Sequence, residues 1–321
     1  MAPDNLAMTT LSQDSSSFID YPLPESLCYM NGNYGRVCDT QISVMDRGFI
    51  FGDGVYEVLP AYNGQVFCFE QHMARLDRSL KELRIDNPLS SAEWKAIARR
   101  LIDDLSQTTG ATNQLIYIQV TRGVAPRDHV MPLGLRPTVY VMASEMKLAS
   151  VEQRACGVAC VTADDFRWKK AHIKSTSLLG AVFARQISAD VGAIETVMFR
   201  DGMLSEAAAS NVWVVKNGVV MGPPKDNLLL EGIRFGLIES ICHTINIPFE
   251  LRQITREEVL AADELLLSSA TKEVLPITLL DNQPVGNGQP GPVYARLYEG
   301  YQTVKAEKCA RGKEKYEHRS T

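Results

Sequence analysis

The chain has 321 residues, of which 45% are hydrophobic and 22% are charged. This composition can bury one large core or two moderate ones, so it predicts a globular protein of one or two domains. The formal net charge of −5 gives no overall field that would attract nucleic acid or an anionic membrane, so large polyanions are not expected as partners, whereas a local basic pocket could still bind a small anion.

Turn residues and hydrophobic periodicity predict a first α/β domain over residues 25–147. A polar, Ser-rich stretch, 1–24, precedes it and is expected to be a flexible lead-in. Asn-Gly pairs mark hairpin turns, and apolar residues three or four apart, such as Met73, Leu76 and Leu80, mark helices. The predicted elements are, in chain order, hairpins in 28–37 and 55–69, helices in 69–85 and 91–107, and strands in 114–123 and 137–146.

A second domain is expected to span residues 148–308. Its predicted elements are a strand in 157–166, a helix in 177–192, strand and hairpin segments in 195–206 and 210–224, a helix in 231–245, a strand in 248–252, a short helix in 256–262 and an apolar run in 263–270. The charged residues 309–321 show no apolar face and are expected to form a flexible tail. This mixed order predicts an α+β protein with two sheet-containing domains.

Cysteine usage and the N-terminal segment predict the compartment. Cys156 and Cys160 lie in an apolar run, ACGVACVTA, that is typical of a buried strand, and no second Cys or His pair stands at zinc spacing. We therefore expect buried thiols, no metal and a reducing compartment. The first residues lack a basic region followed by an apolar stretch, and no window approaches the roughly 20 apolar residues of a membrane helix. The sequence predicts a soluble, cytoplasmic protein.

Two segments each place one ionisable residue in a position that suits a catalytic role. Lys174 stands between a predicted strand and a predicted helix, in FRWKKAHIKSTSLLGAV. If it is buried, desolvation favours the neutral amine that Schiff-base chemistry requires, whereas a lysine at such a junction is otherwise solvated. Glu206 stands among small residues before a strand, in SEAAASNVW, where a flat ligand can approach or where the carboxylate only belongs to a turn. These residues alone leave both alternatives open.

Two loops carry features of anion binding. A predicted helix opens in EGIRFGLI, so the N–H groups of Ile233 and Arg234 are expected to face an anion such as phosphate. The loop VTRGVAPRDH contains Arg122, Arg127 and His129. Neighbouring cations in a Gly/Pro loop favour capture of a carboxylate, and a solvated basic loop is the alternative.

Seven segments in series resemble the class IV (fold type IV) aminotransferases, which depend on pyridoxal 5'-phosphate (PLP), and most closely the bacterial D-amino-acid transaminases. The segments are DRGFIFGDGVYEV (46–58), HMARLDRSL (72–80), YIQVTRGVAPRDH (117–129), FRWKKAHIKSTSLLGAV (166–182), SEAAASNVW (205–213), EGIRFGLI (231–238) and ADELLLSSATKEVLPI (262–277). They stand in family order within residues 28–305. The resemblance implies a fold type IV enzyme with PLP between its two domains.

The resemblance also implies roles for residues at the cofactor. Lys174 is similar to the lysine that carries PLP and moves the Cα proton of the substrate, and Glu206 to the carboxylate that faces the pyridine nitrogen. Arg75 is similar to the phosphate-binding arginine. The phosphate is further expected to meet four residues, largely through backbone N–H groups, namely Ile233, Arg234, Ser269 and Ala270.

Two positions depart from the family pattern. Many relatives have Thr where Arg234 stands, and often a hydroxyl residue where Ala270 stands. Backbone contacts to a phosphate survive these changes, whereas side-chain hydroxyl contacts do not. Arg234 either adds positive charge near the phosphate or points away along its helix, and the sequence leaves both open.

Tyr56, Arg127 and His129 determine the expected substrate. In the D-amino-acid enzymes that the chain resembles, a tyrosine and an Arg-x-His pair hold the substrate carboxylate, and GVYE and PRDH match these groups. Charge-assisted hydrogen bonds contribute about 1.5–3 kcal/mol each, so such a site favours an amino acid over an amine that lacks a carboxylate. The expected reaction is a reversible, ping-pong transfer of an amino group from a D-amino acid, such as D-alanine, to a 2-oxo acid, such as 2-oxoglutarate.

The resemblance implies a homodimer, because the family builds the carboxylate site partly from the neighbouring subunit. Other chemistries of the same class are the alternatives, namely an (R)-selective amine transaminase or an aminodeoxychorismate lyase. A non-catalytic PLP-binding scaffold is an alternative from a different class. The presence of both Lys174 and Glu206 argues against a loss of activity.

Overall fold

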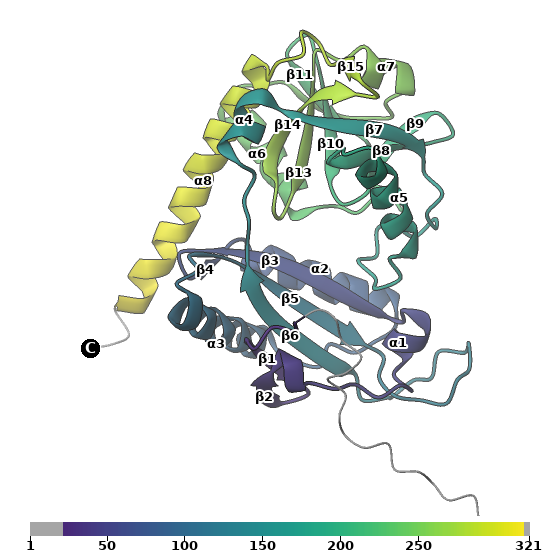
Figure 1. Cartoon of the computed structure of the whole chain (residues 1–321), viewed down its shortest axis with the longest axis vertical. Helices are drawn as coiled ribbons and strands as arrows, with labels where there is room; N and C mark the ends of the chain where they lie inside the picture. Colours follow the sequence, from purple (N-terminus) through teal and green to yellow (C-terminus); the bar gives the residue numbers. More distant parts are fainter. Residues whose placement is uncertain (1–21, 318–321) are drawn as a thin grey trace, which may run out of the picture.

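The structure, a computed structural model, describes residues 22–317. Two sheets lie one above the other, and the long C-terminal helix α8 (Pro292–Glu317) runs along one side of both (Figure 1). Helices and strands are mixed along the chain, which confirms the predicted α+β class. Residues 1–21 of the predicted lead-in, 1–24, lie outside the described residues.

The first sheet is antiparallel and confirms the predicted hairpins. Within the described residues it has six strands in the order β2-β1-β6-β5-β3-β4. Asn31 and Asn63 have positive φ angles of 50° and 49°, and a glycine follows each, which lets the chain reverse in a two-residue turn. The strands are β1 (Leu27–Met30), β2 (Asn33–Arg36), β3 (Gly54–Tyr62), β4 (Gln65–Val66), β5 (Asn113–Thr121) and β6 (Thr138–Glu145).

Helices α2 (Phe69–Glu82) and α3 (Ser91–Thr109) pack against one face of this sheet. The helix faces that periodicity predicts are the buried ones, with Leu76 and Leu80 of α2 and Trp94 of α3 in the core. Side chains alternate along a strand, so β3 presents two different faces. One face joins this core and the other remains available for a site.

The second sheet is mixed and has nine strands in the described part of the chain, in the order β12-β11-β10-β13-β14-β7-β8-β9, with β15 beside β14. One of its apolar cores packs against α6 and α8 and includes Tyr62 and Phe67, so it joins the two sheets. The strands are β7 (Val158–Asp164), β8 (Glu195–Arg200), β9 (Met203–Ala207), β10 (Asn211–Lys216), β11 (Val219–Gly222), β12 (Phe249–Leu251), β13 (Glu264–Ser269), β14 (Glu273–Leu280) and β15 (Gln283–Pro284), and the helices are α5 (Leu179–Asp190), α6 (Ile233–Thr244) and α7 (Arg256–Leu260).

Some elements were not expected from the sequence patterns. They include α1 (Arg47–Phe51), the short 3-10 helix η2 (Val37–Asp39) and α4 (Val151–Cys156). Cys156, expected to be buried in a strand with Cys160, is instead exposed at the end of α4, because Gly157 ends that helix before β7 begins.

The long helix α8 is the largest difference between expectation and structure. Pro292 suits the first position of a helix, and Leu297 and Tyr301, four residues apart, are both buried. Residues 309–317, expected to form a flexible tail, continue this helix, because Ala, Glu, Lys and Arg favour helix and the preceding turns are already packed. Residues 318–321 lie outside the described residues. Among the described helices, none combines the length and the apolar content that a bilayer crossing requires.

Candidate active site

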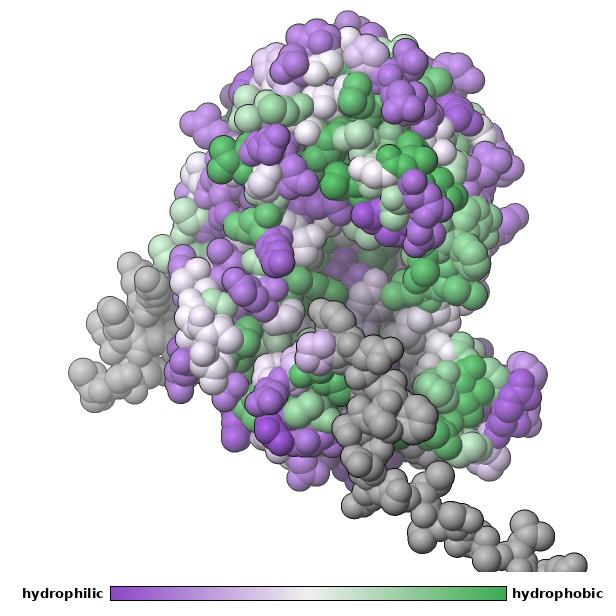
Figure 2. Space-filling view, in the orientation of Figure 1, coloured by the Kyte–Doolittle hydropathy of each residue, from purple (hydrophilic) through white to green (hydrophobic). Residues whose placement is uncertain are grey.

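A cavity of about 1110 Å³ draws its walls from both sheets. The surface of the molecule is hollowed between its two halves (Figure 2). The walls come from β3, α2, the segment between β7 and α5, the turn between β9 and β10, the start of α6 and the loop after β13. Eight of the residues expected at the site line this cavity, namely Tyr56, Arg75, Lys174, Glu206, Ile233, Arg234, Ser269 and Ala270.

Lys174 is held by backbone pairing with the first sheet. It lies between β7 and α5, where its carbonyl accepts a hydrogen bond from the N–H of Tyr56 at 2.9 Å and Ser175 forms a bridge to Val55. The Lys174 Nζ lies 4.0 Å from the centroid of the Tyr56 ring. Among the described residues, no carboxylate forms an ion pair with it. The cavity therefore contains an amine whose position is set by the backbone pairing with β3 and by the contact with the Tyr56 ring.

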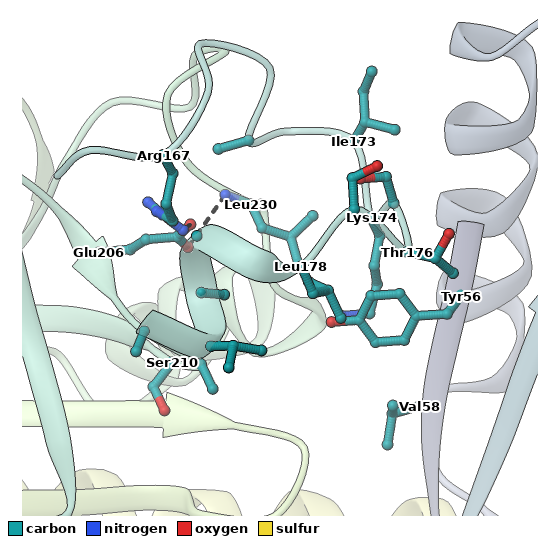
Figure 3. A pocket seen from close by; sticks show the side chains of 18 of the residues that line it. Tyr56, Val58, Arg167, Ile173, Lys174, Thr176, Leu178, Glu206, Ser210 and Leu230 are labelled. Atoms are coloured by element: carbon teal, nitrogen blue, oxygen red, sulfur yellow. Dashed lines mark hydrogen bonds and ion pairs between the residues drawn. The ribbon is translucent and has the colours of Figure 1, made fainter. Parts of the chain in front are cut away.

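Glu206 enters the cavity from the side opposite Lys174 (Figure 3). It lies near the end of β9, is 5% exposed, and accepts hydrogen bonds from Arg167 Nη1 at 2.6 Å and the N–H of Leu230 at 3.2 Å. Burial raises the pKa of Glu206 to about 7, although Arg167 opposes this shift. Because these two effects oppose each other, a second cation beside Glu206 would lower its pKa and favour the ionised carboxylate.

Arg167 is a site residue that the sequence patterns did not reveal. Its Nε and Nη2 bind Asp165, each at 2.9 Å, and its Nη1 binds Glu206. The only signal was its position seven residues before Lys174 in the basic run FRWKK. The arginine fixes the orientation of the Glu206 carboxylate at the far side of the cavity.

The N-terminus of α6 opens on the cavity as the sequence predicts. Gly232 is the N-cap and has no side chain with which to cap the helix, so within the described residues the first N–H groups, those of Ile233 and Arg234, are available to a ligand. A Cβ atom on Gly232 would lie 2.2 Å from Asn211 Oδ1. Asn211 in turn donates to the carbonyl of Leu230 at 2.9 Å, so glycine and asparagine together shape this helix entrance.

Arg75 lies on another wall of the cavity, bound to a carboxylate. Glu57, fully buried in β3, accepts hydrogen bonds from Arg75 Nε at 2.7 Å and Nη2 at 2.8 Å, and contacts His72 Nδ1 at 2.8 Å. Burial opposes the charge on Glu57, but Arg75 and His72 hold its pKa well below the usual range. Burial lowers the pKa of His72 to about 4, so this imidazole is neutral at pH 7. A lone carboxylate in the apolar strand GVYEVLPA was the available signal for Glu57.

Arg127 and His129 do not join Tyr56 in the cavity of the same chain. Both are exposed in the loop between β5 and β6, each 5.5 Å from the ring centre of Phe51. Arg122, which stands beside them in the sequence, is instead buried and binds Asp53 through Nε at 2.8 Å and Nη2 at 3.0 Å. The expectation that Arg122 takes part in carboxylate capture is therefore wrong, because its guanidinium already has a carboxylate.

The residues of the cavity fit the chemistry of PLP. Lys174 provides an amine without an ion-pair partner among the described residues, and Glu206 provides a buried carboxylate across the cavity. The first N–H groups of α6, next to Gly232 and Asn211, provide donors for a phosphate group, and the guanidinium of Arg75 provides others.

Comparison with known proteins identifies the family. Residues 54–280 match the class IV amino-transferases. A D-alanine aminotransferase from Bacillus licheniformis is 38% identical over 263 residues, 82% of this chain and 91% of the relative, and one from Staphylococcus epidermidis is 35% identical over 274 residues, 85% and 96%. The solved branched-chain aminotransferase from Thermoproteus uzoniensis, 24% identical with a TM-score of 0.78, covers 88% of this chain and 95% of its own and shows the same fold. The chain therefore belongs to the class IV aminotransferases, a family whose enzymes imply PLP as the cofactor.

Proposed function

We propose that the chain is a D-amino-acid transaminase, which moves an amino group reversibly between a D-amino acid, such as D-alanine, and a 2-oxo acid, such as 2-oxoglutarate. The observation that carries the proposal is that Lys174 and Glu206 face one cavity in a chain 38% identical to a D-alanine aminotransferase. PLP would be held by Lys174, Glu206 and Arg75 together with the phosphate contacts at Ile233, Arg234, Ser269 and Ala270.

The proposed chemistry divides between Lys174 and Glu206. When bound, PLP supplies an electron sink for the charge left on the Cα atom of the amino acid. Once freed by the incoming amino acid, the Lys174 Nζ would take the Cα proton, hold it as an ammonium group over the face of the Tyr56 ring, and deliver it to the C4' atom of the cofactor instead of back to Cα. Glu206, oriented by Arg167, provides the negative charge that a protonated pyridine nitrogen requires. A cation at this position favours the ionised carboxylate over the neutral form that burial favours.

The carboxylate of the substrate is proposed to bind a site shared by two subunits. Tyr56 lines the cavity of its own chain, whereas Arg127 and His129 are exposed on the loop between β5 and β6. A second copy that brings its own loop to the cavity would place these cations beside Tyr56. Two or three charge-assisted hydrogen bonds would then select an amino acid over a simple amine.

Exposed apolar side chains support a homodimer as the assembly. Val130 and Leu133, in the same loop, and Val182 and Phe183, on α5, are each at least 58% exposed. Figure 2 shows apolar side chains over α5, on the right of the hollow. Groups of large exposed apolar side chains mark interaction surfaces, and we propose that a second copy of the chain covers them.

The cytoplasm is the proposed compartment. The seven cysteines are free thiols, and thiols stay reduced in the cytoplasm.

Substrate turnover tests the proposed function. Purified holoenzyme with D-alanine and 2-oxoglutarate should form pyruvate and D-glutamate, and L-alanine should give no product. Turnover of (R)-1-phenylethylamine without D-alanine activity would indicate an amine transaminase, and pyruvate formed only from 4-amino-4-deoxychorismate would indicate a lyase. A protein that binds PLP but turns over none of these substrates would be a scaffold. Each of these three results contradicts the proposal.

A further inference from the structure

Arg234 is a buried cation that has no carboxylate partner among the described residues. Four arginines are buried in the described part of the chain, and three of them form ion pairs: Arg47, Arg75 and Arg122, with Asp53 or Glu57. Arg234 is 2% exposed and forms no ion pair with any described residue. A buried charge is costly unless it is paired, so an unpaired guanidinium on a residue that lines a cavity raises the question of which anion balances it.

The guanidinium of Arg234 lies beside the elements proposed to hold the phosphate. Arg234 belongs to the first turn of α6 and lines the cavity. Its Nη2 donates to the carbonyl of Ala270 at 3.3 Å, in the loop after β13 on the cavity wall. Burial chiefly, followed by the charges of Arg75 and then Arg234, lowers the pKa of His72, which lines the same cavity. The guanidinium is therefore close to two of the cavity walls, the start of α6 and the loop after β13.

Tyr301 of α8 holds this guanidinium in place. Its hydroxyl, fully buried, accepts a hydrogen bond from Arg234 Nε at 3.3 Å, and the ring of Phe67 lies 5.3 Å from Arg234 Cζ. Burial raises the pKa of Tyr301, so its hydroxyl stays neutral and does not cancel the charge of Arg234. Figure 1 shows α8 alongside both sheets, which explains how a residue near the C-terminus reaches this site.

Arg75 contributes hydrogen bonds to the site but little net charge. Its guanidinium forms two hydrogen bonds with Glu57, so the two residues together are neutral. Its remaining nitrogen, Nη1, donates to the carbonyl of Glu231 at 3.2 Å, next to the start of α6. A phosphate dianion bound there would accept hydrogen bonds from Arg75. The positive charge that balances the dianion would have to come from another residue.

We propose that Arg234 supplies this positive charge to the phosphate group of the cofactor, and that Tyr301 is the positioning residue that orients it. The inference rests on the proposed function for the identity of the cofactor as PLP. It assigns to the side chain of Arg234 a role that a threonine at this position could not have, and it makes α8 a part of the cofactor site.

Binding of PLP and of pyridoxal, which lacks the phosphate, tests this role without any turnover. The dissociation constants for both compounds are measured by titrating the apoprotein and following absorbance. The dissociation constant for pyridoxal divided by that for PLP is the ratio that gives the preference for the phosphate. Arg234→Met and Arg234→Gln should each lower this ratio about tenfold or more, the scale expected for one unit charge in a partly buried site, while Arg234→Lys should lower it by less than about threefold. Tyr301→Phe should lower it by about threefold, since one hydrogen bond is lost.

Matched variants separate charge from structure. Arg252→Met removes a surface arginine that pairs with Glu258, and Tyr298→Phe removes a hydroxyl from α8 at a residue only partly buried. Both should leave the ratio unchanged. If Arg234→Met does not fold, Arg234→Gln, which keeps a donor for the carbonyl of Ala270, gives the same comparison.

Two results would overturn the inference. One is an equal loss of affinity for PLP and pyridoxal in the neutral Arg234 variants, which would make Arg234 a structural clamp; the other is a wild-type protein without preference for PLP. A wild-type protein that prefers PLP in this test but does not turn over D-alanine would contradict the proposed function and leave this inference intact.

Discussion

Arg75 and Glu57 form a two-point ion pair in which Nε lies 2.7 Å from Oε1 and Nη2 lies 2.8 Å from Oε2. Neither side chain is more than 7% exposed. The pair joins α2 to β3 at the wall of the cavity, so the arginine expected at the phosphate is immobilised before any ligand binds. Fixed donors of this kind do not have to be ordered when the ligand arrives.

Glu57→Gln should destabilise the apoprotein, because it leaves the buried guanidinium of Arg75 without its carboxylate. Removing one partner of a buried ion pair costs about 3–5 kcal/mol, which in a chain of this size lowers the melting temperature by about 5 °C or more. Glu258→Gln, which breaks the half-exposed pair with Arg252, is the control and should cost less than about 1 kcal/mol. Thermal denaturation of both apoproteins is the measurement, and equal shifts would contradict the importance of the buried pair.

Lys174→Ala should lower transamination of D-alanine by at least about 1000-fold, because one amine both attaches the cofactor and moves the proton. Borohydride treatment followed by peptide mapping should locate the cofactor on Lys174 in the wild-type protein and on no lysine in the variant. Lys170→Ala, an exposed lysine in the same segment, is the control. Cofactor attached to another lysine in the wild-type protein would refute the assignment.

Arg127→Ala should raise KM for D-alanine by about 10- to 100-fold with a smaller change in kcat, since it removes a charge-assisted bond to the substrate carboxylate. Arg136→Ala removes an exposed arginine from the same loop and should leave KM unchanged. Steady-state kinetics over a range of D-alanine concentrations gives both constants. An unchanged KM in Arg127→Ala would show that the carboxylate binds elsewhere.

Mixing Lys174→Ala and Arg127→Ala subunits tests whether a second copy completes each site, provided that activity is measured at a D-alanine concentration well below the wild-type KM, where the raised KM leaves Arg127→Ala nearly inactive. A hybrid dimer of Lys174→Ala and Arg127→Ala contains one site with both residues intact if the two residues come from different chains. After unfolding and refolding an equal mixture, activity should recover to about a quarter of the wild-type value, because half of the dimers are hybrids with one intact site each. Activity that stays at the average of the two variants would place both residues in one chain.

The stability of the protein should fall between pH 6.5 and about pH 4 because of His72. Burial lowers the pKa of His72 to about 4, so below pH 6.5 the unfolded chain takes up a proton that the folded protein does not. The contribution is therefore complete above pH 6.5 and is lost as the pH falls toward 4. His72→Asn keeps a donor for Glu57 and does not titrate, so its melting temperature relative to wild type should rise as the pH is lowered from 7.5 to 5. A difference independent of pH would exclude His72 as the source.

The sequence by itself determined the elements whose signals are local. Asn-Gly pairs set the turns after Met30 and Tyr62, the spacing of leucines set the buried face of α2, and Gly232 set the start of α6. A turn or a helix depends on residues within a few positions of one another, so a single stretch contains its cause. The seven motifs, which stand in family order, also indicated the family to which the chain belongs.

The tertiary structure alone decided which charged groups meet. Arg122 binds Asp53, 69 positions away, and Arg234 reaches Tyr301, 67 positions away, and neither contact has a local signal. Lys174 enters the cavity because its backbone pairs with β3, which the sequence around it does not encode. Burial and ion pairing are properties of the space around a side chain, and only the packing of distant segments creates that space.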